Sequence, residues 1–349
     1  MAVDGDAPGV AAALPWLPLL PWQAGPARAA LAQRASWPHA LLIHGPRGIG
    51  KHALALNFAQ ALLCEAPRAD HLACGECPGC RYAQAGQHPD LVRLELLAID
   101  PDDGELKAFE TINVDRVRAL IDTVGLTSHR QRAKVAVIAP AERMNVQAAN
   151  ALLKTLEEPP AGTFMILVSD MPGRLPATIV SRCRRLAAPQ PTKDESCAWL
   201  AAQGVAAPEE ALAQAAGAPR LALELAGDDW QDERRVWLVA LANPRRLGVL
   251  ALAARVEAGA KEARRARLAR VIDWLLAWTA DLARIAAGGD ARGNPDFAAQ
   301  LAPLAAAVAP LAAIRYHGQL LRARALLAHP LQPRLVAESL LIDYRSLFR

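Results

Sequence analysis

The stretch "ALLIHGPRGIGKHALALNFAQALL" (residues 40–63) decides the fold of this chain. Its first residues are mostly apolar, as in a buried strand, and its last twelve repeat apolar side chains at helical spacing. Between them, Gly45, Gly48, Gly50 and Lys51 follow the pattern of a phosphate-binding loop. In such a loop the backbone N–H groups at the helix start contact phosphate oxygens, and the lysine reaches the terminal phosphates. We therefore predict a nucleotide-binding loop here.

Three further apolar runs predict buried strands, at residues 91–96, 134–139 and 163–169. Helical patterns at Val114–Val124 and Val146–Leu156 separate these runs. Alternation of strands and helices is typical of a parallel sheet covered by helices on both faces. The fold class that follows is an α/β phosphate-loop domain with a parallel sheet flanked by helices.

The chain of 349 residues is long enough for two or three domains. The α/β domain is expected at residues 1–188, with a cysteine-containing module inserted at 64–80. A turn-rich break then introduces a small helical domain at residues 189–228. Strand signals vanish beyond Trp230, so residues 229–349 are predicted to form a separate all-helical domain.

Composition excludes several classes of protein. Hydrophobic residues make up 53% and charged residues 21% of the chain, as in ordinary globular proteins. The net charge of +4 allows a nucleic-acid surface but does not argue for one, because a strong electrostatic footprint would be more basic. No segment is typical of a membrane span or of a secretory signal. We expect a cytoplasmic protein without membrane association, whose thiols stay reduced.

Four cysteines lie close together in the sequence. Cys64, Cys74, Cys77 and Cys80 form the pattern C-x9-C-x2-C-x2-C. Four thiolates at this spacing suit tetrahedral Zn²⁺ in a closed structural site, so we predict that these residues bind zinc. The alternatives are a redox-active dithiol, four unrelated cysteines, or an iron–sulfur cluster, which usually has a tighter run of ligands.

The phosphate loop lacks the groups that hydrolysis needs. Mg²⁺ is normally held by a Ser or Thr after the lysine and by an acidic residue that ends a neighbouring strand. His52 takes the first position, and imidazole is a poor ligand for a cation that prefers oxygen. Ala139 and Pro140 stand where an Asp-Glu pair is expected, and Glu142 comes too late. The sequence predicts binding of ATP or ADP without efficient hydrolysis.

Three motifs carry a family resemblance: "NALLKTLEEPP" (150–160), the strand "TFMILVS" and "LPATIVSRC" (175–183). With these motifs the chain closely resembles the AAA+ subunits of the bacterial clamp loader, over roughly residues 20–228. The inserted cysteines are shared with that family. The resemblance implies that residues 189–228 form the lid domain and residues 229–349 the collar domain through which the subunits form a ring.

The "SRC" motif (Ser181, Arg182, Cys183) implies a role for one arginine. In the family this arginine reaches out of its own subunit into the ATP site of the neighbour. A guanidinium supplied in trans can stabilise the charge that develops on a transferring phosphoryl group. The resemblance therefore assigns Arg182 to catalysis in trans, whereas composition alone would make it a surface arginine in a basic turn.

The resemblance also points to sensors of bound nucleotide. Arg220 matches the second-domain sensor arginine of active relatives, although a solvent-facing arginine at a helix start is an equal alternative. The first sensor position falls at Ser169 or Asp170, where relatives tend to carry Thr. These departures weaken any role in sensing nucleotide.

The implied function is that of a hydrolytically inactive subunit of the DNA polymerase III clamp loader, accessory to a DNA-directed DNA polymerase (a nucleotidyltransferase). Its partners would be the ATPase subunits (tau/gamma) and the delta subunit in a hetero-pentameric ring, which uses ATP to load the sliding clamp onto primed DNA. The first alternative is an ATP-hydrolysing motor subunit of tau/gamma type, disfavoured by Ala139 and Pro140. The second is a zinc-dependent DNA-binding module, disfavoured by the low net charge.

Overall fold

The structure, a computed structural model, describes residues 16–99, 106–130, 132–258, 263–327 and 332–348. The chain forms two compact units, Met1–Glu195 and Ser196–Arg349. The chain divides between Glu195 and Ser196, which coincides with neither of the predicted domain boundaries, at residues 188 and 228. Those two boundaries stay predictions.

The first unit is built on a five-stranded parallel sheet with the order β2-β5-β6-β1-β7. Its strands are β1 (Ala40–His44), β2 (Leu91–Glu95), β5 (Lys134–Ala139), β6 (Thr163–Ser169) and β7 (Arg184–Ala187). The register pairs His44 with Ser169 and Glu95 with Ala139, so the carboxyl ends of these strands lie at one edge. Four strands were predicted from apolar runs. The fifth, β7, was not predicted.

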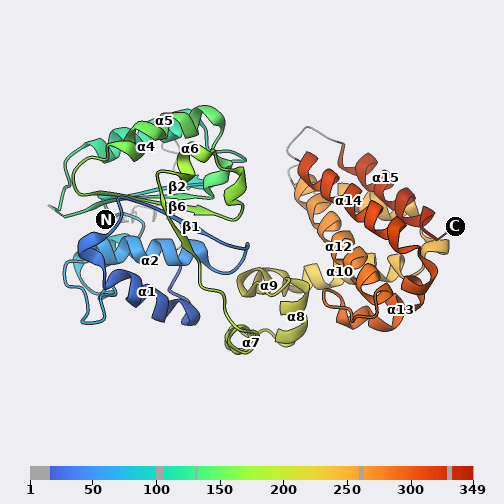
Figure 1. Ribbon diagram of the computed structural model, residues 1–349. Helices are drawn as coiled ribbons and strands as arrows, with labels where there is room; N and C mark the ends of the chain where they lie inside the picture. Colours follow the sequence, from blue (N-terminus) through green and yellow to red (C-terminus); the bar gives the residue numbers. More distant parts are fainter. Residues whose placement is uncertain (1–15, 100–105, 131, 259–262, 328–331, 349) are drawn as a thin grey trace, which may run out of the picture. The chain divides into compact units, whose positions relative to one another are not determined.

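Helices cover both faces of this sheet, as predicted. Helices α1 (Ala24–Leu31) and α2 (Lys51–Leu63) lie on one face, and α4 (Val114–Gly125), α5 (Val146–Glu157) and α6 (Ala177–Val180) on the other (Figure 1). Each layer forms its own apolar core against the sheet. The predicted α/β fold class is confirmed.

Helix α2 is the central helix of this unit. All its residues except His52 and Asn57 are buried. A helix that is apolar on nearly all sides belongs in the interior of a domain. The helix therefore holds the loop before it and the cysteine after it in place.

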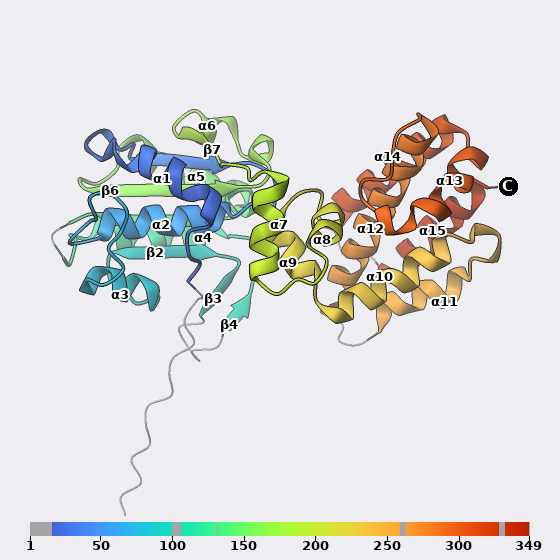
Figure 2. The same cartoon turned by 90° about the horizontal axis from the view of Figure 1, so that it is seen from below.

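Short elements complete the first unit. The antiparallel hairpin of β3 (Leu97–Ile99) and β4 (Leu106–Ala108) follows β2 directly (Figure 2). The remaining elements are α3 (Pro78–Gln84) and the 3₁₀ turns η1 (Pro21–Gln23), η2 (Arg34–Ser36), η3 (Ala141–Arg143) and η4 (Pro172–Arg174).

The second unit is helical throughout its described residues. Helices α7 (Lys193–Ala202, which begins in the first unit), α8 (Pro208–Gln214) and α9 (Pro219–Leu225) share a small apolar core. The larger core around Trp237, Trp278 and Tyr344 belongs to the following helices. These are α10 (Asp228–Leu241), α11 (Val249–Ala254), α12 (Ala263–Ala286), α13 (Ala298–Ala307), α14 (Pro310–Leu326) and α15 (Pro333–Ser346), with η5 (Pro244–Arg246), η6 (Arg255–Glu257) and η7 (Pro295–Phe297) between them.

The described helices differ from a membrane span in length or hydropathy. No single helix among them is long and apolar enough to cross a membrane. One pair, Pro295–Ala307 with Pro310–Leu326, meets the test together but is bent by 115°.

The turn from β1 into α2 requires glycine. Gly50 has a φ of 95°, in the left-handed region that side chains with a Cβ rarely adopt. A Cβ at this position would lie 2.2 Å from Leu20 Cδ1 and 2.8 Å from Gln23 Nε2. The segment around Leu20 thus packs directly against the backbone of the loop.

We expect Gly50→Ala to lower the free energy of unfolding by more than about 2 kcal/mol, because it adds both overpacking and backbone strain. Urea-induced unfolding measures this change. The control is Gly125→Ala at the end of α4, where a Cβ meets no atom within 4 Å. Equal stability of the two variants would contradict the prediction.

Candidate functional site

The phosphate loop joins the carboxyl end of β1 to the first turn of α2. Gly48 and Gly50 adopt φ values of 80° and 95°. Two side chains from the preceding segment brace the loop: Trp22 Nε1 donates to the Ile49 carbonyl at 3.2 Å, and Gln23 Nε2 donates to the Gly50 carbonyl at 2.8 Å. The strand–loop–helix setting predicted for this motif is present.

Lys51 is buried at the start of α2, with 3% of its side chain exposed. Its Nζ lies 2.6 Å from Asp170 Oδ1 and donates to the Pro46 carbonyl. Asp170 follows β6 at the predicted first sensor position, next to the buried Ser169. A buried ammonium needs a partner of opposite charge, and here that partner is a carboxylate of the same chain.

His52 faces a different carboxylate. Its Nε2 lies 3.1 Å from Glu95 Oε1, and Arg93 Nε donates to the same oxygen at 2.6 Å. Burial by itself would raise the pKa of Glu95, but the contacts with His52 and Arg93 outweigh burial and lower this pKa. The position after the lysine thus carries an imidazole that contacts the Glu95 carboxylate, and it offers no hydroxyl oxygen to a metal.

The predicted acidic positions are also filled without a metal ligand. Ala139 ends β5 and Pro140 follows it, and neither side chain carries an oxygen. Glu142 lies on η3, where its Oε1 accepts the backbone N–H of Asp170 at 2.9 Å. Glu142 therefore holds the chain that carries Asp170.

Arg182 lies between α6 and β7 with 33% of its side chain exposed. Its Nε donates to Glu157 Oε1 at 2.7 Å, a second guanidinium nitrogen contacts the same oxygen, and Nη1 donates to the Thr178 carbonyl at 3.0 Å. Glu157 is the last residue of α5. This contact joins two of the motifs that carry the resemblance, and no role for Glu157 was predicted from the sequence.

The neighbours of Arg182 have structural surroundings. Ser181 Oγ donates to the Thr178 carbonyl at 3.2 Å. Cys183 is buried in the core beneath α5, and burial raises the pKa of its thiol to about 11. Of the three "SRC" side chains, only Arg182 combines a charge with access to solvent. Arg220 lies on α9 in the second unit and is half-buried, and its sensor role stays a prediction.

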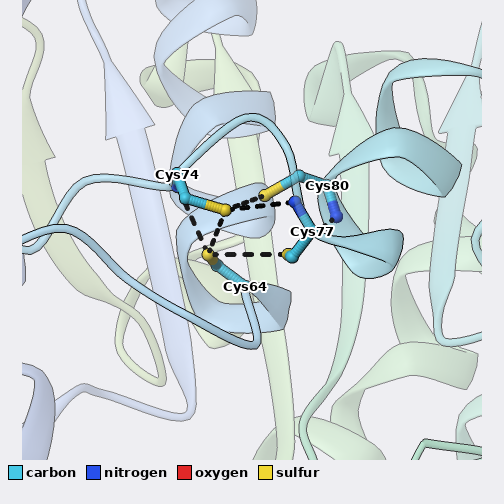
Figure 3. Close-up of side chains that lie close together, drawn as sticks. All are labelled: Cys64, Cys74, Cys77 and Cys80. Atoms are coloured by element: carbon cyan, nitrogen blue, oxygen red, sulfur yellow. Dashed lines mark hydrogen bonds between the residues drawn. The ribbon is translucent and has the colours of Figure 1, made fainter.

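The four clustered cysteines converge on one point (Figure 3). Cys64 ends α2, Cys74 lies in the loop that follows, and Cys77 and Cys80 lie at the start of α3. The Sγ atoms of Cys64 and Cys74 are 3.6 Å apart, those of Cys64 and Cys77 3.9 Å, and those of Cys74 and Cys80 3.8 Å. These four thiols could hold a metal ion.

The backbone around the cysteines favours thiolates. Burial opposes ionisation of Cys77, but the N–H groups of Glu65 and Cys80 point at its sulfur and help to lower the pKa of its thiol to about 6. Burial raises the pKa of Cys64 and of Cys80. Arg132 donates to the Cys64 carbonyl at 2.9 Å, which fixes the end of α2.

The sequence of this chain is similar to those of DNA polymerase III subunits. A family model described as "DNA polymerase III, delta subunit" matches residues 28–192. DNA polymerase III subunit delta' of Pseudomonas aeruginosa is 43% identical over 220 residues, which cover 62% of this chain and 64% of that protein. Subunit delta' of Haemophilus influenzae is 34% identical over 247 residues and 70% of each chain. Subunit tau of Bacillus subtilis is 36% identical over 156 residues, 45% of this chain and 25% of that protein.

The parallel sheet, the phosphate loop and the two motifs around Glu157 and Arg182 define a subunit of the AAA+ class. The matches narrow this class further, because the delta' proteins of Pseudomonas aeruginosa and Haemophilus influenzae match 62% and 70% of the chain and the tau protein matches 45%. The chain belongs to the family of DNA polymerase III delta' subunits. The matched segment spans less than two thirds of the Pseudomonas relative.

The depressed pKa of Glu95 predicts how stability depends on pH. A carboxylate whose pKa is lowered by folding stabilises the protein above its ordinary pKa of 4.5, and this contribution is lost as the pH falls further. Glu95→Gln is expected to lower the free energy of unfolding at pH 7 by about 2–4 kcal/mol, because Arg93 and His52 lose their charged partner. The difference in free energy of unfolding between Glu95→Gln and the unsubstituted protein should shrink between pH 5 and pH 3, as measured by urea-induced unfolding.

The matched control for this experiment is Glu158→Gln, which alters an exposed carboxylate after α5. It should leave the stability near that of the unsubstituted protein at each pH. If the loss of stability in Glu95→Gln stays constant or grows on acidification, the predicted link between the lowered pKa of Glu95 and stability is contradicted.

Proposed function

We propose that this chain acts as the delta' subunit of a clamp loader, which assists the ATP-driven loading of a sliding clamp onto primed DNA without hydrolysing ATP itself. One observation carries the proposal: the chain keeps a solvent-accessible Arg182 while its own loop lacks the groups that bind Mg²⁺. Family membership supports the assignment. A tau/gamma-type motor is less supported, because Ala139 and Pro140 replace its acids.

The absence of hydrolysis follows from the chemistry of four positions. Phosphoryl transfer needs a metal that bridges phosphate oxygens and a group that positions the attacking water. His52 pairs with Glu95, Ala139 and Pro140 carry no oxygen in their side chains, and Glu142 accepts a backbone N–H. Lys51 still supplies a cation at the position that reaches phosphate. Binding of ATP or ADP without turnover is therefore the expected behaviour of this loop.

The proposed contribution to catalysis is made in trans. The Arg182 guanidinium would enter the ATP site of a neighbouring tau/gamma subunit and stabilise the negative charge that develops on the transferring phosphoryl group. Glu157 orients the guanidinium from inside the chain, and the Thr178 carbonyl accepts from a second nitrogen. Glu157 thus holds the charge in the free subunit, and Arg182 would exchange this carboxylate for the phosphate of the neighbouring site.

The proposed partners are the tau/gamma subunits and the delta subunit in a hetero-pentameric ring. Ring contacts would use residues 229–349. On α14, Leu311, Ile314 and Leu321 are each more than half exposed, which supports an apolar surface that a partner covers. The ring would act in the cytoplasm, where the cysteine thiols stay reduced.

We predict that Arg182→Ala reduces ATP hydrolysis by a reconstituted loader at least tenfold, and up to about 10³-fold, because trans arginines contribute factors of this order or more. The rate is measured with tau/gamma, delta, clamp and primed DNA present. Arg184→Ala, which changes an exposed arginine on β7, is the control and should keep the normal rate. An unchanged rate with Arg182→Ala would overturn the proposal.

Zn²⁺ is the ion proposed for the cysteine site. Four sulfurs that are each about 2.3 Å from a tetrahedral zinc lie about 3.8 Å from one another. The separations of 3.6, 3.9 and 3.8 Å fit this geometry. With four protein ligands such a site is closed, so the zinc would stabilise the loop between α2 and α3 and do no chemistry.

The purified chain is expected to contain about one zinc per molecule by elemental analysis. Cys77→Ser should lower this content, whereas Cys197→Ser, on α7, should keep it. Chelation should lower the melting temperature by several degrees, and acid should release the metal because the thiolates become protonated. A metal-free chain with unchanged melting after treatment with chelator would overturn the assignment.

A further inference from the structure

The strongest unassigned feature is the buried ion pair at the phosphate loop. Lys51 Nζ lies 2.6 Å from Asp170 Oδ1, and only 3% of the Lys51 side chain is exposed. Asp170 is 31% exposed, so the pair is open to solvent on the side of the carboxylate. The two residues come from different elements, the start of α2 and the end of β6.

Asp170 has the chemistry of a phosphate substitute. A carboxylate and a phosphate both offer anionic oxygens to an ammonium group at hydrogen-bond distance. The lysine of a phosphate loop is the group that reaches the terminal phosphates of a nucleotide. Here the same Nζ already contacts an anionic oxygen of its own chain.

The carboxylate is held in this position by its backbone. The N–H of Asp170 donates to Glu142 Oε1 at 2.9 Å, and the N–H of Met171 donates to Ser169 Oγ at 3.1 Å. Glu142 itself lies on η3, directly after β5. The contact between Asp170 and Lys51 therefore depends on segments that follow three neighbouring strands, β5, β6 and β1, and not on a free surface loop.

We propose that Asp170 occupies the phosphate position of the loop and sets its affinity for nucleoside di- and triphosphates. A nucleotide must displace the carboxylate from Lys51, and the displaced carboxylate then repels the incoming phosphates. The wild-type loop binds such ligands weakly as a result. This proposal rests on the proposed function, in which the loop is hydrolytically silent, and it names the residue that weakens nucleotide binding.

Removal of the carboxylate charge should reopen the site. Asp170→Asn leaves Lys51 with a positive charge and no anionic partner at 2.6 Å, so a phosphate group becomes its best available ligand. The binding gained should not depend on Mg²⁺, because the position after Lys51 is His52, already paired with Glu95. Metal-independent binding distinguishes this mechanism from restoration of an active ATPase site.

The experiment measures binding of fluorescent ADP and of pyrophosphate to the full chain, in Mg²⁺ and in EDTA. Asp170→Asn is expected to bind both ligands at least tenfold more tightly than the unsubstituted chain. The double variant Asp170→Asn with Lys51→Ala should lose this gain. Asp122→Asn, which removes an exposed charge on α4, is the matched control and should leave binding unchanged.

Asp170→Ser serves as a second variant, and thermal melting adds a measurement that reports folding. Either variant should melt at a lower temperature than the unsubstituted chain and should regain stability when pyrophosphate is added. Equal affinity of the unsubstituted chain and both variants would overturn the proposal. So would two destabilised variants that pyrophosphate fails to stabilise.

These outcomes are separable from the test of the proposed function. Nucleotide binding is measured on the isolated chain, whereas the role of Arg182 is measured as ATP hydrolysis by the assembled loader. A loader insensitive to Arg182→Ala would overturn the proposed function and leave the contact between Asp170 and Lys51 to be judged by binding alone.

Discussion

Helix α2 is packed on nearly all sides, and both candidate sites are attached to its ends. Lys51 is its first residue, and Cys64 follows its last. Its 13 residues place these groups about 20 Å apart along one rigid axis. The helix cannot move without exposing its apolar surface. Partners for the Lys51 ammonium at one end and the Cys64 thiol at the other must therefore come from the surrounding chain. The Asp170 carboxylate, directly after β6, does so at one end, and three further cysteines do so at the other.

The sequence predicts those parts of the structure that depend on local spacing. Glycines and Lys51 between an apolar run and a helical pattern predicted the loop, and short intervals between cysteines predicted their convergence. Four strands appeared as apolar runs. Strand β7 did not, because it is short and mostly exposed at the sheet edge, and neither did the β3–β4 hairpin, with three residues in each strand.

The contacts that define the chemistry of the site were not predictable in the same way. Lys51 meets Asp170, His52 meets Glu95, and Arg182 meets Glu157. Each pair joins residues that are distant in sequence, and each depends on the order and register of strands. Motif comparison alone identified the missing metal ligands, but only the folded arrangement shows that Lys51 and Arg182 already have carboxylate partners within the chain.

The contact between Arg182 and Glu157 has a consequence for how a ring could work repeatedly. In the proposed role, Arg182 leaves a carboxylate and meets a phosphate, so it exchanges one anion for another and never crosses a dry interface as an unpaired cation. Such an exchange has a small net cost in free energy, both when Arg182 leaves the carboxylate and when it returns. In that role, once the phosphate departs, the carboxylate at the end of α5 would take the guanidinium back and so reset the subunit for the next cycle.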